Sequence, residues 1–181
     1  MIHDDVREVF VDEKEIQQIC KRLGEEISRD YEGKEILALV ILKGSMVFAA
    51  DLIRYISVPL RLDFMQASSY GDGTKSTGII KIKKDMDNSA EGKHIIIIED
   101  IIDSGNTLFN IHKLLEDRGA ASVNICTFLS KPSRREIDVD VKYIGKEVPD
   151  EFLVGYGLDF AENYRSLPYV GVLKPQVYAK I

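Results

Sequence analysis

The sequence predicts an α/β fold in which a central, mostly parallel sheet is flanked by helices. Short apolar runs at 35–42, 95–98 and 123–129 have the length and composition of buried strands. Apolar residues at 46–56 and 107–118 recur at helical spacing. Strands that alternate with helices along a chain pair in parallel, because each helix returns the chain to the same edge of the sheet.

We expect a single domain over residues 1–181, because no repeat, low-complexity tract or linker divides the chain. A first amphipathic helix is predicted to begin at Asp12, since Asp12 and Glu15 resemble a capping box. Gly119 is expected to end the helix at 107–118. In chain order, the other expected elements are a strand at 35–42, a helix at 46–56, an alternating strand at 58–64, strands at 95–98 and 123–129, and shorter strands near Val141 and Phe152.

The segment 68–93 breaks this alternation. It opens with Ser-Ser-Tyr-Gly-Asp-Gly-Thr-Lys-Ser-Thr-Gly, which is too polar and glycine-rich to pack into a core. Residues 79–84 alternate in part, and a polar turn follows near Asp87 and Asn88. An insertion of this kind is either a plain surface hairpin or a lid that excludes water from a reaction. We therefore expect a flexible loop or hairpin at about 69–93.

Composition and charge narrow the class of protein. The net charge of −6 disfavours a nucleic-acid binder that relies on bulk positive charge. No apolar run approaches membrane-spanning length, and the first residues lack the apolar region of a signal peptide. We therefore expect a cytoplasmic protein with no membrane or nucleic-acid partner. Cys20 and Cys126 lie within apolar patterns and are expected to be buried thiols.

The most informative stretch is Ile95-Ile-Ile-Ile-Glu-Asp-Ile-Ile-Asp-Ser-Gly-Asn-Thr107, in which an apolar strand leads into carboxylates and small polar residues. Residues 104–107 are expected to form a turn into a helix, whose free N–H groups and dipole favour a phosphate group. The spacing is not that of a Walker loop. A simple N-cap and turn, or a response-regulator-like metal site, would produce parts of the same pattern.

Three carboxylates accompany this predicted phosphate cradle. Glu99 and Asp100 point to opposite faces if the strand continues through them. One or both could hold ribose hydroxyls or Mg²⁺, which prefers carboxylate and substrate oxygens. Asp103 lies beside the cradle, so it is the candidate for a general base.

Other polar residues are expected at the same edge of the sheet. Leu42-Lys43-Gly44-Ser45 is a second strand-to-helix turn, with a cation and a glycine that suit a second phosphate group. Lys131 follows another strand and is either a ligand or a solvated lysine. Phe152 could stack on a planar base or belong to the core. Asp159 and Arg165 suit a metal–pyrophosphate complex, or they form a surface ion pair.

Together these motifs resemble the 6-oxopurine (hypoxanthine-guanine) phosphoribosyltransferases, within the type I phosphoribosyltransferase family, from near the N-terminus to about Arg165. The string from Glu99 to Thr107 matches that family's signature for phosphoribosyl pyrophosphate (PRPP), although Asn106 stands where related enzymes often have lysine. The resemblance implies these roles: Asp103 as catalytic base; Glu99, Asp100, Asp103, Ser104, Gly105, Asn106 and Thr107 around the ribose and its 5′-phosphate; Lys43, Gly44 and Arg165 at pyrophosphate; Ile101, Lys131, Phe152 and Leu153 at the purine; Ser69 and Tyr70 at the start of the catalytic loop; and Glu99, Asp100 and Asp159 at the metal.

The resemblance also implies an architecture and a reaction. A small hood would be formed by the N-terminal segment and the region after residue 131, and the peptide bond Leu42–Lys43 would be cis. The expected reaction uses Mg²⁺ and transfers the phosphoribosyl group from PRPP to hypoxanthine or guanine, giving IMP or GMP plus pyrophosphate, in a homodimer or homotetramer. The sequence leaves open a sibling enzyme that prefers xanthine and a regulator of the same fold that binds RNA.

Overall fold

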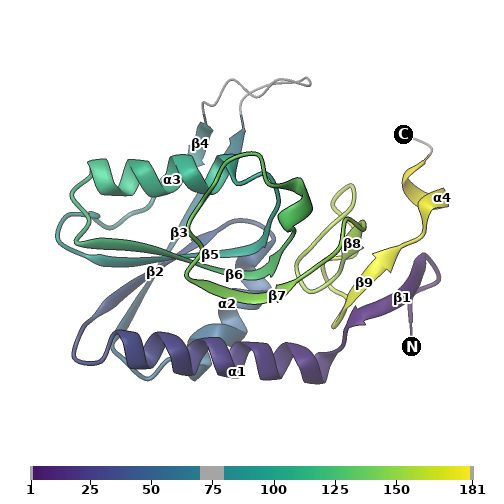
Figure 1. Ribbon diagram of the computed structural model, residues 1–181, viewed down its shortest axis with the longest axis horizontal. Coiled ribbons are helices and arrows are strands. Elements are labelled where there is room, and N and C mark those ends of the chain that lie inside the picture. Colours follow the sequence, from purple (N-terminus) through teal and green to yellow (C-terminus); the bar gives the residue numbers. More distant parts are fainter. Residues whose placement is uncertain (1, 70–79, 180–181) are drawn as a thin grey trace.

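A six-stranded sheet forms the centre of the computed structural model, which describes residues 2–69 and 80–179. The strand order is β4-β3-β2-β5-β6-β7 (Figure 1). All neighbouring strands are parallel except β4, which pairs antiparallel with β3. The predicted α/β fold with a mostly parallel sheet is thus confirmed. The strands are β2 (Ile36–Ile41), β3 (Leu60–Ser69), β4 (Ile80–Lys84), β5 (His94–Ile102), β6 (Ser122–Ser130) and β7 (Tyr143–Glu147).

Helices cover both faces of this sheet (Figure 1). Helices α1 (Glu13–Asp30) and α2 (Ser45–Leu52) pack on one face, and α3 (Asn106–Asp117) packs on the other. Because side chains alternate along a strand, even-numbered residues of β2 join the first core and odd-numbered residues join the second. None of the helices in the described ranges combines the length and the apolar character needed to cross a bilayer.

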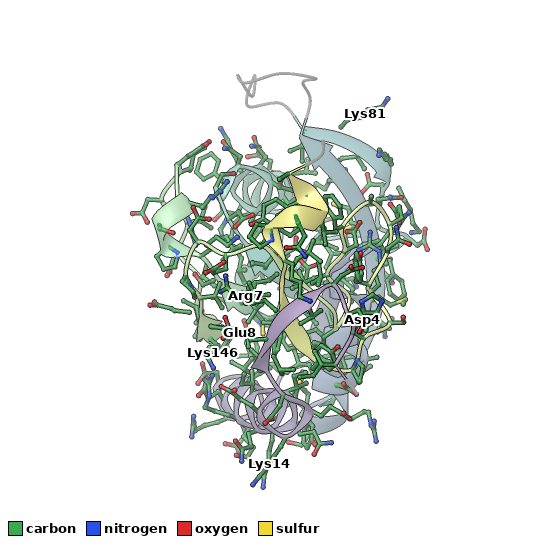
Figure 2. All side chains as sticks on the ribbon, turned by 90° about the vertical axis from the view of Figure 1, so that its right-hand side faces the viewer. Asp4, Arg7, Glu8, Lys14, Lys81 and Lys146 are labelled. Carbon is green, nitrogen blue, oxygen red and sulfur yellow. The ribbon has the colours of Figure 1, made fainter. Side chains whose placement is uncertain are left out.

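A second, small sheet lies at one end of the large one (Figure 1). It has the order β1-β9-β8, with β1 (Val6–Val11), β8 (Leu153–Val154) and β9 (Val170–Leu173), and the short helix α4 (Pro175–Tyr178) follows. The hood was expected from the N-terminal segment and the region after residue 131. The small sheet lies within these segments, but β7, which also follows residue 131, pairs with β6 in the large sheet. Figure 2 looks onto this end, where Arg7 and Glu8 project from β1. Arg7 Nη2 lies 2.8 Å from Glu8 Oε1 and 3.0 Å from Glu151 Oε1, so it ties β1 to the segment before β8.

Several predicted boundaries are confirmed and others are wrong. The carboxylate of Asp12 accepts the N–H of Glu15 at 2.8 Å, as expected for the start of α1. Gly119 adopts a left-handed φ of 80° just beyond α3. The strand predicted to end at Ile98 instead continues to Ile102, because β6 pairs with it along that length. The predicted last turn of α2 is a 3₁₀ turn at Ile53–Tyr55.

The predicted insertion at 69–93 begins and ends within described structure. Ser69, the last residue of β3, pairs with Ile80 at the start of β4, so the two strands are the arms of a hairpin. Residues 70–79, including Tyr70, lie outside the described residues. The expectation of a lid therefore stays a prediction.

The segment that follows β4 is fastened to β3 by a buried carboxylate. Asp63, only 3% exposed, accepts the backbone N–H of Asp87 at 3.0 Å and that of Asn88 at 2.8 Å. The side-chain amide of Asn88 donates a further bond at 2.8 Å. Burial opposes ionisation of Asp63, but the hydrogen bonds from Asn88 and Asp87 outweigh it and hold its pKa below the usual value.

We expect Asp63→Asn to lower the free energy of unfolding at pH 7 by about 1–3 kcal/mol, because buried N–H donors lose a charged acceptor. A carboxyl pKa depressed in the folded state stabilises the fold above the unfolded-state value of about 3.9. That contribution disappears as the pH falls through the lower folded-state pKa. Urea unfolding of both proteins at pH 7 and near pH 3 should therefore show a difference that shrinks in acid. An equal difference at both pH values would contradict this account.

Candidate active site

Three loops that follow neighbouring parallel strands meet at one edge of the large sheet. Residues 42–44 follow β2, residues 103–105 follow β5, and Lys131 follows β6. From β2 the chain continues to β3 on one side, whereas β5 lies on the other side, so the strand order reverses between β2 and β5. The crevice beyond the carboxyl ends of the strands at such a reversal is where open α/β sheets bind ligands.

The loops after β2 and β5 line one cavity of about 330 Å³. Lys43, Ser104, Thr107 and Arg165 contribute to its walls. Gly105 precedes α3 with a φ of 85°, a left-handed conformation that glycine adopts readily. The first N–H groups of α3 have no acceptor within the helix, so they are available to an anion. This cavity, which we call the anion cavity, therefore suits a phosphate group.

The loop after β2 is packed too closely to admit any side chain at Gly44. Its peptide bond Leu42–Lys43 is cis, as the resemblance implied. A Cβ added to Gly44 would lie 1.6 Å from Asp100 Oδ2. A Cβ added to Gly157, whose φ is 100°, would lie 2.0 Å from the carbonyl oxygen of Gly44. This loop therefore fills the space between β5 and the segment after β8.

Glu99 and Asp100 form an adjacent pair of carboxylates at the floor of the anion cavity. Burial raises the pKa of Glu99 well above its usual value, and the neighbouring charge of Asp100 adds to this effect. Burial also raises the pKa of Asp100. Among the described residues, no group of three or more metal-binding side chains is present. A cation here would therefore need ligand oxygens in addition to these carboxylates, which is the usual situation of Mg²⁺.

A second cavity, of about 420 Å³, adjoins the first, because Asp100, Ile101, Asp103 and Asp159 line both. We call it the aromatic cavity. Lys131 lines it, and its side chain is only 10% exposed, so it is not a solvated lysine. Its Nζ donates to the carbonyl oxygen of Glu151 at 3.0 Å and lies 3.6 Å from Asp103 Oδ1.

Phe152 and Leu153 complete the wall of the aromatic cavity opposite the sheet. Phe152 is 36% exposed, so it does not belong to the closed core. Phe160 meets its ring edge-on with centroids 5.3 Å apart, and Tyr178 stacks on it with centroids 5.0 Å apart. Rings fixed in this way present an apolar surface to a planar ligand.

Asp159 and Arg165 form an ion pair at the junction of the two cavities. Arg165 Nη2 lies 2.9 Å from Asp159 Oδ1, and Arg165 Nη1 donates to the carbonyl oxygen of Gly157 at 2.8 Å. The buried Nε of Arg165 has no hydrogen-bond partner in the described part of the chain. This guanidinium therefore has one donor that the described residues leave unsatisfied, and that donor is buried.

Most residues singled out from the sequence line one of these cavities. The exceptions are Gly44, which packs behind the anion cavity, and Asn106, which donates to Glu136 Oε2 at 2.7 Å. Tyr70 and the side chain of Ser69 lie outside the described structure, so their roles stay predictions. The sequence analysis missed Arg134, Asp150, Tyr178 and Glu162. Tyr178 lies near the end of the chain and carries no local signal. Glu162 falls between Asp159 and Arg165, so inspection of that turn could have found it.

Comparisons with known proteins agree with this geometry. Residues 8–161 match the phosphoribosyl transferase domain family. The hypoxanthine-guanine phosphoribosyltransferase of Staphylococcus aureus is 51% identical over 178 residues, which cover 98% of this chain and 99% of that protein. The chain therefore belongs to the phosphoribosyltransferase family.

Solved structures place it further within that family. A crystal structure of a hypoxanthine phosphoribosyltransferase from Staphylococcus aureus has a TM-score of 0.95 and 52% identity, over 97% of this chain and 96% of that one. A hypoxanthine-guanine phosphoribosyltransferase from Bacillus anthracis has a TM-score of 0.90 and 44% identity, over 93% of this chain and 99% of that one. Along nearly its whole length, the chain is therefore similar to enzymes that act on 6-oxopurines.

We expect Gly44→Ala to weaken the binding of pyrophosphate about ten-fold or more, because the added methyl group collides with Asp100 and displaces the loop. Isothermal titration calorimetry with Mg²⁺ and pyrophosphate measures this change. Gly92→Ala is the control: its φ of 69° strains any side chain and lowers stability, but a Cβ there meets no atom within 4 Å and lies outside both cavities, so the affinity should not change. Unchanged affinity in Gly44→Ala would show that the close packing is irrelevant to the anion cavity.

Proposed function

We propose that this chain transfers the 5-phosphoribosyl group of PRPP to hypoxanthine or guanine, forming IMP or GMP and releasing pyrophosphate. The observation that carries the proposal is the pair of adjoining cavities. One has two anion-binding turns, the other has an apolar wall and a buried lysine, and Asp103 lines both. A reaction between an anionic sugar phosphate and a planar base needs this arrangement. The names of the relatives and the resemblance of the motifs support the same substrates.

The anion cavity offers a place for each part of PRPP. The 5′-phosphate would lie on residues 103–107, where Gly105 and the start of α3 present N–H groups. The ribose hydroxyls would meet Glu99 and Asp100. The pyrophosphate group would lie between the loop of Lys43 and Gly44 and the guanidinium of Arg165. A substrate with phosphate at both ends thus spans the reversal between β2 and β5.

The carboxylates of this site fit Mg²⁺, which takes hard oxygen ligands from one or two carboxylates and from substrate phosphates. One or two of the carboxylates of Glu99, Asp100 and Asp159 would hold it together with oxygens of PRPP, since these three do not form one cluster of ligands. When bound, Mg²⁺ supplies positive charge that stabilises the departing pyrophosphate. The family resemblance further supports a homodimer or homotetramer.

Residues of both cavities would act on the reaction itself. As pyrophosphate departs, the anomeric carbon gains positive charge, as in glycoside chemistry. Lys43 and Arg165 stabilise the negative charge that builds on the leaving group. N9 of the purine forms the new bond to the anomeric carbon, while the carboxylate of Asp103 accepts the proton from N7.

Lys131 would select the base. Its ammonium group has only donors, so it pairs with a 6-oxo oxygen and opposes a 6-amino group. Its bond to the carbonyl oxygen of Glu151 leaves further donors available. The 2-position would meet the backbone of Leu153, which discriminates little among hypoxanthine, guanine and xanthine.

The proposed function predicts a pattern of substrates. With PRPP and Mg²⁺, we expect hypoxanthine and guanine to give nucleotide, and adenine and uracil to give none. Product formation is followed by chromatography for these four bases and xanthine. Preferred turnover of xanthine would favour the sibling enzyme. Binding of nucleotide without turnover of any base would favour a regulator, and efficient use of adenine would overturn the role of Lys131.

Asp103→Asn should lower kcat by about 10²–10⁴, because the amide cannot accept the N7 proton. The KM for PRPP should change little, since the amide keeps the size of the side chain. Steady-state kinetics over a range of pH separates the two parameters. Asp140→Asn, an exposed position outside both cavities, should behave as the unmodified protein. Turnover of Asp103→Asn within a few-fold of that protein would rule out this base.

A further inference from the structure

Glu162 places a carboxylate between the two cations assigned above to pyrophosphate. Lys43 Nζ lies 3.2 Å from Glu162 Oε1 and 3.1 Å from Oε2. Arg165 Nη2 lies 3.3 Å from Glu162 Oε2. Lys43 comes from the loop after β2, and Arg165 comes from the segment after β8, so the carboxylate joins two distant parts of the chain.

The backbone holds Glu162 in this position. Its N–H donates to Asp159 Oδ2 at 2.9 Å, and its φ is 65°, a left-handed value that a residue with a side chain adopts rarely. The hydrogen bonds with Lys43 and Arg165 lower the pKa of Glu162, so the group is an anion at neutral pH. The carboxylate therefore gives Lys43 and Arg165 a negatively charged acceptor oxygen, as a phosphate group would.

The contact is also weak enough to be exchanged. The side chains of Lys43 and Glu162 are 55% and 66% exposed, and ion pairs in contact with water contribute little net free energy. A pyrophosphate group carries more charge and more acceptor oxygens than one carboxylate. Arg165 Nη2 lies closer to Asp159 Oδ1, at 2.9 Å, than to Glu162 Oε2, at 3.3 Å, so its contact with Glu162 is the weaker of the two.

We propose that Glu162 is an internal competitor for pyrophosphate: its carboxylate neutralises Lys43 and Arg165 in the free protein, and the pyrophosphate end of PRPP displaces it. This inference rests on the proposed function. Glu162 then lowers the affinity of the site for substrate and product alike. It eases the release of pyrophosphate, because the carboxylate returns to the cations as the product leaves.

The test uses Glu162→Gln, which keeps the length of the side chain and its backbone N–H but removes the charge. We expect the Kd for pyrophosphate, measured by calorimetry with Mg²⁺, and the KM for PRPP to fall about two- to five-fold at low ionic strength. The KM for hypoxanthine should stay unchanged. The ratio between the two proteins should approach one at about 0.5 M salt, because salt screens exposed charges.

Glu35→Gln is the matched control. It removes one carboxylate from an exposed ion pair, that of Glu35 Oε1 with Arg61 Nε at 2.6 Å, outside both cavities. It should alter neither constant. An unchanged or weaker affinity for pyrophosphate in Glu162→Gln would overturn the inference, since it would mean that Glu162 only orients the cations.

Lys43→Ala separates this inference from the function on which it rests. If Lys43→Ala weakens pyrophosphate binding and Glu162→Gln does not strengthen it, the internal competitor is wrong and the pyrophosphate site stands. If Lys43→Ala leaves the affinity unchanged, the assignment of Lys43 to pyrophosphate is wrong and the inference falls with it. In the double variant, the gain from Glu162→Gln should shrink, because one of the two cations is gone.

Discussion

The parallel pairing of β2 with β5 is the constraint on which the rest of the structure depends. It joins segments about sixty residues apart and brings the loops after both strands to one edge of the sheet. Parallel strands cannot be joined by a tight turn, so both strands need crossovers, and these place α2 and α3 on opposite faces. Each helix begins at the same edge, where its first N–H groups have no acceptor within the helix. The site for two anionic groups that we propose therefore depends on the strand order.

Close packing at Gly44 and Gly157 then attaches the small sheet to this edge of the large sheet. Gly44 lies against Asp100 on one side and against Gly157 on the other, at distances that exclude a side chain. The segment after β8, which carries Asp159 and Arg165, is thereby fixed above the loop after β2. Arg7 reinforces the same arrangement through its ion pair with Glu151, which lines the aromatic cavity. Both cavities lie between the sheet and this segment, so their shape depends on these backbone contacts.

The sequence predicted those elements of the fold and of the site that are determined by residues close together in the chain. The apolar runs of β2 and β5 and the turn at 103–107 follow from residue patterns within a few positions. The end of β5 was misplaced because Ile101 and Ile102 follow two carboxylates, and only the pairing with β6 keeps this stretch extended. Strand β1 was missed because Arg7 and Glu8 interrupt its apolar residues, and β9 because it has only four residues; the two are stabilised mainly by each other. The stacking of Tyr178 on Phe152 likewise depends on a contact between distant segments.

Many carboxylates line the two cavities, although the proposed substrate is itself a polyanion. The ion pairs of the site explain how both can be accommodated. Lys131 lies beside Asp103, and Arg165 pairs with both Asp159 and Glu162, so the cations are already neutralised by the protein. Desolvation in the cavity raises the pKa of Glu99 and that of Asp100, although both side chains are only half-buried. Under the proposed function, a divalent cation with PRPP reverses this balance, since it favours ionised Glu99 and Asp100 while the phosphates take over the cations. On this proposal, substrate binding is an exchange of ion pairs, in which phosphate oxygens replace the protein carboxylates at Lys43 and Arg165.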